Sequence, residues 1–191
     1  MINHTVGFAV CGSFCTFGKV LDRLQTLCDA GFHIIPIMSY NAYTTDTRFG
    51  SAETFIQRME QMTGNKVICS LPAAEPIGPK KMLDLLIVAP CTGNTLAKLA
   101  VGIADTPVTL AVKSQLRNAR PVLIGISTND ALGTAAANIG TLMSRKHFYF
   151  IPYRQDDCVN KPTSVVADFS LMLPAAMSAM AGEQLQPMLL Q

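Results

Sequence analysis

The segment Ala89–Thr95, APCTGNT in one-letter code, places hydrogen-bonding side chains among small residues. It follows the apolar run Leu85–Val88, which is typical of a buried strand, and it precedes an amphipathic pattern that begins near Asn94. Backbone amides at the start of a helix lack partners within the helix, so this turn suits an anionic or polar ligand. The Asn94 side chain both donates and accepts hydrogen bonds, and we expect it to be a catalytic residue.

Two further polar loops follow predicted strands. Gly12 and Ser13 come after the first strand, and Ser39 opens the loop after the second. The first loop lacks the G-x-G-x-x-G pattern and no acidic residue ends the second strand, so we do not expect this chain to bind a nicotinamide dinucleotide. Gly12 and Ser13 fit either a monophosphate site or a plain turn. Arg48 either faces an anionic ligand or lies on the surface.

Cys91, at the end of the central apolar run, is either a nucleophile or a small packed residue. A nucleophilic cysteine needs a base within hydrogen-bonding distance. The histidines, His4, His33 and His147, precede or open predicted strands, at the opposite end of the sheet. We therefore favour a packed cysteine that lines a pocket. The three histidines also lack the spacing of metal ligands, so we expect no metal site.

The acidic residues offer no obvious pair of carboxylates for acid–base catalysis. Asp105 is expected to cap a helix that opens with Thr106-Pro107, because proline is favoured in a first helical turn. Asp156–Asp157 share a predicted loop with Arg154 and Lys161. This mixed-charge cluster is either a solvated turn or a subunit contact.

The hydrophobic pattern predicts strands alternating with helices. The predicted strands are 6–10, 32–38, 67–70, 82–89, 121–126 and 148–151. The predicted helices are 16–29, 52–62, 94–101, 106–117, 131–145 and 163–180, the last interrupted at Pro174. Residues 39–50 and the proline-rich 72–79 are expected to be irregular.

Wholly apolar strands that are each followed by a helix indicate a parallel sheet covered on both faces. The expected fold is α/β, a three-layer, doubly wound parallel sheet of Rossmann-like or flavodoxin-like type in a single domain. Ligands of such sheets bind beyond the carboxyl ends of the strands. The loops at Ser13, Ser39 and Asn94 are therefore expected to converge on one site.

Composition narrows the class of protein. The 191 residues fit one α/β domain over 1–182 with a C-terminal tail over 183–191. Hydrophobic residues make up 49% and charged residues 15%, which fits either extensive subunit contacts or a well-covered core. A net charge of +2 without a basic cluster argues against nucleic-acid binding. With no leader, no membrane-length apolar run and six cysteines without a C-x-x-C pair, we expect a cytoplasmic protein with reduced thiols.

Two segments, VGFAVCGSFCTF and PCTGNTLAKLAVGIADTPVTLA, resemble the flavoprotein family of homo-oligomeric FMN-containing cysteine decarboxylases. The resemblance covers roughly residues 6–181. It implies FMN as a cofactor and a homo-oligomer. By motif, the phosphate contacts would fall on Gly12, Ser13 and Ser39. The isoalloxazine or substrate contacts would fall on Pro90, Cys91, Thr92, Gly93, Asn94 and Thr95.

The chain departs from the decarboxylases of that family at two places. Residues 50–83 contain no histidine where those enzymes carry a catalytic one. Residues 128–134, TNDALGT, lack the P-x-M-N-x-x-M pattern of their substrate-clamping segment. Decarboxylation of a peptidyl cysteine is therefore not the expected activity.

A narrower resemblance is to one group of this family, the B subunits of dipicolinate synthase. It rests on CGSFCTF, APCTGNTLAKLA, ISTNDALG and YRQDDCVNKPTSVVAD. It implies an A subunit that carries NAD(P), and oxidation of a hydroxytetrahydrodipicolinate or dihydrodipicolinate to pyridine-2,6-dicarboxylate during sporulation.

A dicarboxylate substrate needs cations or oriented amides. The helix amides at Asn94 and Thr95 would hold one carboxylate, and Arg48, Arg154 or Lys161 the other. An FMN-dependent decarboxylase and a non-catalytic scaffold subunit remain the alternatives.

Overall fold

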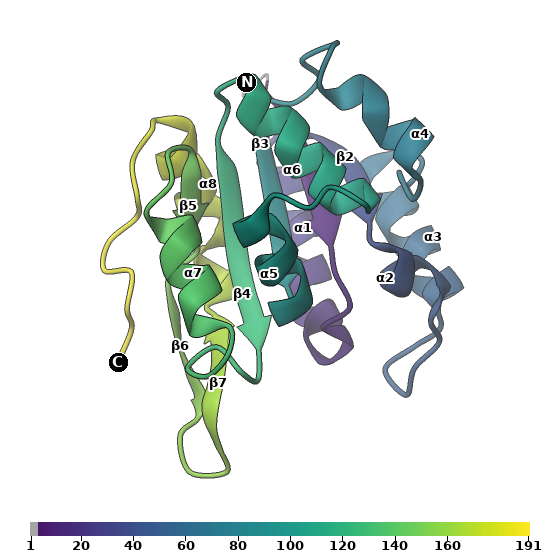
Figure 1. The fold of residues 1–191 in the computed structure, drawn as a ribbon. Coiled ribbons are helices and arrows are strands. Elements are labelled where there is room, and N and C mark those ends of the chain that lie inside the picture. The colour runs from purple at the N-terminus through teal and green to yellow at the C-terminus, as the bar shows by residue number, and fades with distance from the viewer. Residues whose placement is uncertain (1–3) are drawn as a thin grey trace.

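A sheet of seven strands forms the centre of the computed structural model, which describes residues 4–191 (Figure 1). Five strands are parallel in the order β2-β1-β3-β4-β5. They are β1 (Thr5–Val10), β2 (His33–Met38), β3 (Leu85–Cys91), β4 (Val122–Thr128) and β5 (Phe148–Phe150). This order is that of flavodoxin-like folds, with the switch point between β1 and β3. The predicted fold class is confirmed.

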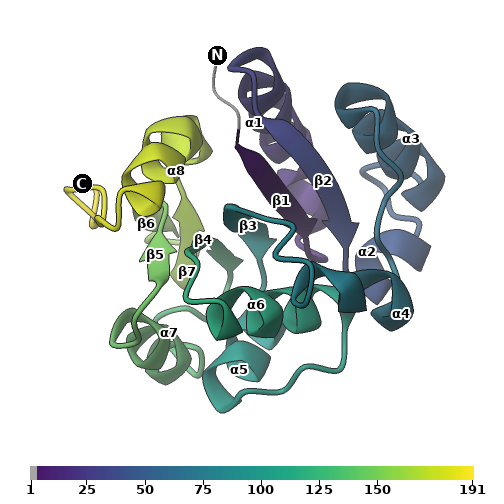
Figure 2. The ribbon, with the colours of Figure 1, turned by 90° about the horizontal axis from the view of Figure 1, so that it is seen from above.

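Helices cover both faces of the sheet, as Figure 2 shows in a view from above. One layer contains α1 (Phe17–Asp29), α3 (Ala52–Thr63) and α8 (Met172–Met180), whose buried side chains form one core cluster with β1 and β2. The other layer contains α4 (Leu71–Ala74), α5 (Gly93–Val101), α6 (Pro107–Arg117) and α7 (Ala136–Met143), which form a second cluster. Every residue of β3 is buried between the two layers. Among the helices of residues 4–191, none has the length and apolarity that a membrane span requires.

Short polar side chains fix where several helices begin. The Ser51 hydroxyl accepts a hydrogen bond from the Thr54 amide at 3.1 Å and caps α3, as predicted. Thr106 caps α6 through a reciprocal arrangement with Thr109. The expectation that Asp105 caps this helix is wrong, because its carboxylate lies 2.8 Å from the Lys98 ammonium instead.

Two segments expected to be irregular contain helical turns. Residues 39–50 include α2 (Tyr40–Thr44), which Ser39 caps, and 72–79 begin within α4 and continue into η2 (Glu75–Ile77). Prolines are tolerated there because they occupy first-turn positions, where no amide partner is needed. The strand expected over 67–70 is reduced to a single bridge between Ile68 and Ile37.

The largest difference from the predicted elements lies in residues 153–170. In place of a helix from residue 163, the chain forms the hairpin of β6 (Tyr153–Asp157) and β7 (Lys161–Ala167). β7 pairs antiparallel with the end of β4, so the sheet is mixed rather than wholly parallel. Thr163, Val165 and Val166 are β-branched, which favours a strand. Pro174 lies in the first turn of α8 and does not break it.

The segment after residue 182 lies along the sheet. The Gln184 side chain accepts from the Phe150 amide and donates to the Phe150 carbonyl, both at 2.7 Å. The Tyr153 amide and carbonyl bond with Met188 and Leu190, each at 3.0 Å. These contacts attach the C-terminal segment to β5 and β6.

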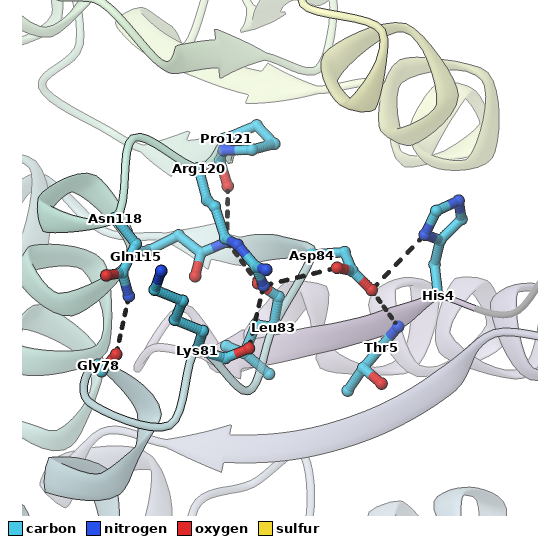
Figure 3. A network of polar contacts seen from close by, with 10 residues as sticks. All are labelled: His4, Thr5, Gly78, Lys81, Leu83, Asp84, Gln115, Asn118, Arg120 and Pro121. Carbon is cyan, nitrogen blue, oxygen red and sulfur yellow. Dashed lines mark hydrogen bonds and ion pairs between the residues drawn. The ribbon is translucent and has the colours of Figure 1, made fainter.

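A polar network closes the amino end of the sheet (Figure 3). Asp84 accepts a hydrogen bond from the Thr5 amide at 2.9 Å and lies 3.5 Å from the Arg120 guanidinium. Arg120 also donates to the carbonyl groups of Lys81 and Leu83. The chain that leads into β3 is therefore held by one side chain from the α6–β4 loop.

Two amide side chains extend this network. Gln115 is buried, at 1% exposure, and donates to the carbonyl groups of Leu83 at 3.3 Å and Pro121 at 3.4 Å. Asn118 donates to the Gly78 carbonyl at 2.9 Å. The polar side chains at this end thus bind the protein's own backbone.

Candidate functional site

A cleft of about 990 Å³ opens at the carboxyl end of the sheet. Gly12 and Ser13 from the loop after β1 line it together with Thr92, Gly93 and Asn94 from the loop after β3. The predicted convergence of these two loops is confirmed. The switch point between β1 and β3 explains it, because the connections from these strands leave toward opposite faces of the sheet.

The end of β4 forms part of the same cleft. The Ser13 and Ser127 hydroxyl oxygens lie 2.8 Å apart and share a hydrogen bond, and Ser127 is buried. Ser127 was not predicted as a site residue from the sequence. The available signal was the polar stretch Ser127–Asp130, which follows the apolar run at 122–126.

A carboxylate from the loop after β4 lies beside the start of α5. The Thr92 hydroxyl caps this helix by accepting the Thr95 amide at 3.3 Å. A Cβ on Gly93 would lie 2.8 Å from both the Asp130 carboxylate and the Thr128 hydroxyl, which hydrogen bond to each other. This arrangement argues against the expectation that the Asn94 and Thr95 amides hold a substrate carboxylate, because the Thr95 amide already binds Thr92 and the nearby Asp130 carboxylate would repel an anion.

The loop after β2 borders a smaller pocket of about 190 Å³. Ser39 lines it, while Thr92 and Asn94 line both the pocket and the large cleft. Thr95 contributes a hydroxyl and Lys98 an ammonium group to this pocket. The third predicted loop therefore joins the site through a side compartment.

Three cations line the large cleft. They are Lys19, Arg48 and Lys161. Lys161 is paired with Asp156 at 2.9 Å, and Arg48 packs its guanidinium 4.9 Å from the centre of the Phe49 ring. Lys19 was not identified from the sequence.

Arg154, the third expected substrate cation, does not line this cleft. It forms an ion pair with Asp168 at 2.5 Å. The Ser170 hydroxyl and the Arg154 guanidinium both hold the pKa of the Asp168 carboxyl below its usual value. Arg154 therefore binds the turn that follows β7.

Pro90 and Cys91 are buried at the end of β3 and line neither pocket. The Pro90 carbonyl accepts a hydrogen bond from the Cys11 amide at 3.2 Å, which joins the ends of β3 and β1. Burial raises the pKa of the Cys91 thiol well above its usual value, and raises that of Cys11 to about 11. Both thiols are neutral at physiological pH, which agrees with packed cysteines rather than nucleophiles.

Comparison with known proteins gives consistent matches. A family model described as Flavoprotein matches residues 1–165. The B subunit of dipicolinate synthase from Bacillus subtilis (strain 168) is 42% identical over 97% of this chain and 93% of its own length. The crystal structure of the dipicolinate synthase B subunit from Bacillus halodurans C superposes with a TM-score of 0.91 at 41% identity, covering 98% of this chain and 96% of that one.

A more distant likeness is to the FMN-dependent cysteine decarboxylase SpaF. Its crystal structure has a TM-score of 0.69 at 21% identity, covering 93% of this chain and 97% of that one. This likeness extends to the fold alone.

Proposed function

The chain belongs to the flavoprotein family, and on this basis we propose that it is the B subunit of a dipicolinate synthase. In this role it works with an A subunit that carries NAD(P), in the cytoplasm of a sporulating cell. The pair converts a hydroxytetrahydrodipicolinate or dihydrodipicolinate to pyridine-2,6-dicarboxylate. The 42% identity over nearly the whole chain is the observation that carries this proposal.

The donor groups of the site fit FMN. The small pocket combines the Ser39 and Thr95 hydroxyls, which can donate hydrogen bonds to a phosphate monoester, with the Lys98 ammonium, which also pairs with Asp105. The adjoining cleft has apolar walls, which include Phe14 and Val166, that suit a flat ring system. Thr92 and Asn94 border both spaces, so one ligand can span them.

We infer that Gly12, Ser13 and Ser39 hold the polar groups of FMN, while Thr92, Gly93 and Asn94 border its ring. When bound, FMN supplies a hydride acceptor for oxidation of the dihydropyridine ring. The Asn94 amide orients the substrate through hydrogen bonds in the cleft. Arg48 holds one substrate carboxylate, because no acidic residue among residues 4–191 forms an ion pair with it.

The test begins with the purified protein and an A-type subunit. We expect the two to co-purify, the purified protein to turn yellow on addition of FMN, and the pair to form dipicolinate. Release of carbon dioxide by this chain alone would favour the decarboxylase alternative. Full activity of the A-type subunit alone would favour the scaffold alternative.

Replacement of Asn94 tests the role of that side chain. We expect Asn94→Ala to lower kcat/KM of the pair by roughly tenfold or more, since a positioned hydrogen bond is lost. Asn138→Ala is the matched control, because Asn138 lies on α7 outside the cleft and has no side-chain hydrogen bond among residues 4–191. Full activity of a folded, assembled Asn94→Ala pair would remove Asn94 from the mechanism.

A further inference from the structure

One wall of the cleft contains a hydroxyl group that the protein itself does not use. Ser164 of β7 is 6% exposed and lines the cleft, and within residues 4–191 its side chain has no hydrogen-bond partner. No completely enclosed side-chain nitrogen or oxygen of the described residues lacks a partner. The Ser164 oxygen therefore keeps an accessible surface, and the space that this residue lines is the cleft.

The strand register supports this orientation. Val166 of β7 is paired with Ser127 of β4, and residues two apart on a strand point to the same face. Ser164 therefore points to the face of Ser127 and Val166, which also line the cleft. Ser164 is more than nine-tenths buried as a residue, and its unpartnered hydroxyl opens only toward the cleft, where a bound ligand can supply the missing hydrogen bond.

A cation faces the same space from α1. Lys19 lines the cleft, and within residues 4–191 it forms no ion pair. Cys15, one turn before it, lines the cleft too, as does Lys161 of β7. The start of α1 and strand β7 therefore border the same cleft.

The charges of the cleft leave this region positive. Asp156 neutralises Lys161, and Asp130 makes the start of α5 negative. Lys19 and Arg48 are the remaining cations, and they come from separate elements. Two separate cations suit a ligand with two carboxylates on one ring, because each cation can bind one carboxylate.

We propose that Lys19 and Ser164 form a carboxylate-binding subsite between α1 and β7, which holds the second carboxylate of the substrate while Arg48 holds the first. The Lys19 ammonium donates a charge-assisted hydrogen bond, and the Ser164 hydroxyl donates a second one. Since Arg48 keeps the role suggested for it, this subsite takes the role that the sequence suggested for the Asn94 and Thr95 amides. It rests on the proposed function, since that function supplies the dicarboxylate.

The test measures turnover by the complete A/B pair and binding of two probes by calorimetry. The probes are pyridine-2,6-dicarboxylate and pyridine-2-carboxylate, which differ by one carboxylate. We expect Lys19→Met to raise KM roughly tenfold and Ser164→Ala about fivefold, each with kcat within about twofold of the original. The affinity gap between the two probes should shrink in Lys19→Met, and Lys19→Arg should restore it.

Lys113→Met is the matched control, because Lys113 is an exposed lysine of α6 outside the cleft and without an ion pair among the described residues. It should change neither KM nor the affinity gap. An unchanged gap in Lys19→Met, or no dicarboxylate binding by the original pair, would overturn the subsite. Absence of dipicolinate formation by the original pair would instead count against the proposed function, and probe binding would still decide on the subsite.

Discussion

The two ends of the sheet use similar polar side chains in opposite ways. At the amino end, Asp84, Gln115, Asn118 and Arg120 bond to backbone groups of the protein (Figure 3). At the carboxyl end, the side chains of Lys19, Arg48, Asn94 and Ser164 border a cleft and make no hydrogen bond with another residue of 4–191. Polar side chains that hydrogen bond to the backbone stabilise a fold, whereas polar side chains that face a cleft without a partner are available to a ligand.

This contrast separates stability from function in a way that single substitutions can test. Substitutions at the amino end should lower the free energy of unfolding and spare ligand binding. Substitutions at the carboxyl end should weaken ligand binding, and they should lower stability only where they also remove a hydrogen bond within the protein.

The largest effect on stability is expected for Arg120→Met. The substitution leaves the carbonyl groups of Lys81 and Leu83 without this donor and Asp84 without its guanidinium partner. We expect a loss of about 2 kcal/mol in the free energy of unfolding, measured by urea denaturation. Arg23→Met on α1 is the control, because among the described residues Arg23 has no side-chain hydrogen bond or ion pair. A stability loss below that of the control would contradict the assigned role of Arg120.

An intermediate effect is expected for Ser127→Ala. The substitution removes the hydrogen bond to Ser13 and should cost about 1 kcal/mol of stability. It should also weaken FMN binding roughly tenfold, because Ser13 loses the partner that orients it. Ser114→Ala is matched in burial, since both serines are 7% exposed, but Ser114 faces the core from α6. FMN affinity is measured by flavin fluorescence. Equal affinity in Ser127→Ala and Ser114→Ala would contradict the proposal that polar side chains at the carboxyl end of the sheet serve ligand binding.

The smallest effect concerns the buried thiols of Cys11 and Cys91, and its test needs no substitution. Burial raises the pKa of Cys11 to about 11, so at pH 8 this thiol is protonated and shielded. Iodoacetamide at that pH should label the exposed Cys15 and Cys158 and spare Cys11 and Cys91. Raising the pH toward 11 should ionise the unfolded chain's thiols before Cys11, so stability should fall over that range. Mass spectrometry of the labelled peptides checks the prediction, and rapid labelling of Cys11 in the folded protein would contradict it.

Much of the fold was predictable because its strongest signals are local. The apolar runs at 85–88 and 122–126 indicate the buried strands, and Ser51 and Gly64 mark the ends of α3 as expected. The hairpin was not predictable in this way. Residues 161–163 are exposed in β7, so its hydrophobic pattern covers only half the strand, and its partner is the distant end of β4.

The candidate site was predictable only in part, for a similar reason. Gly12, Ser13 and Asn94 follow the strands of a parallel sheet, so topology alone brings them together. Lys19 and Ser164 enter the cleft from a helix and from the hairpin, and neither residue lies in a recognisable motif. Their positions depend on tertiary packing, which a single sequence does not display.

The covered edges of the sheet restrict how copies of this chain can assemble. Asn65 and Ile68 bind the outer backbone groups of β2, and the segment from Gln184 onward does the same for β5 and the start of β6. A second copy therefore finds few free strand groups on the body of the sheet with which to build a continuous intermolecular sheet. Any symmetric assembly should therefore join through helical surfaces or through the β6–β7 hairpin, whose outer strand β6 is left uncovered beyond Tyr153 by the other residues of 4–191.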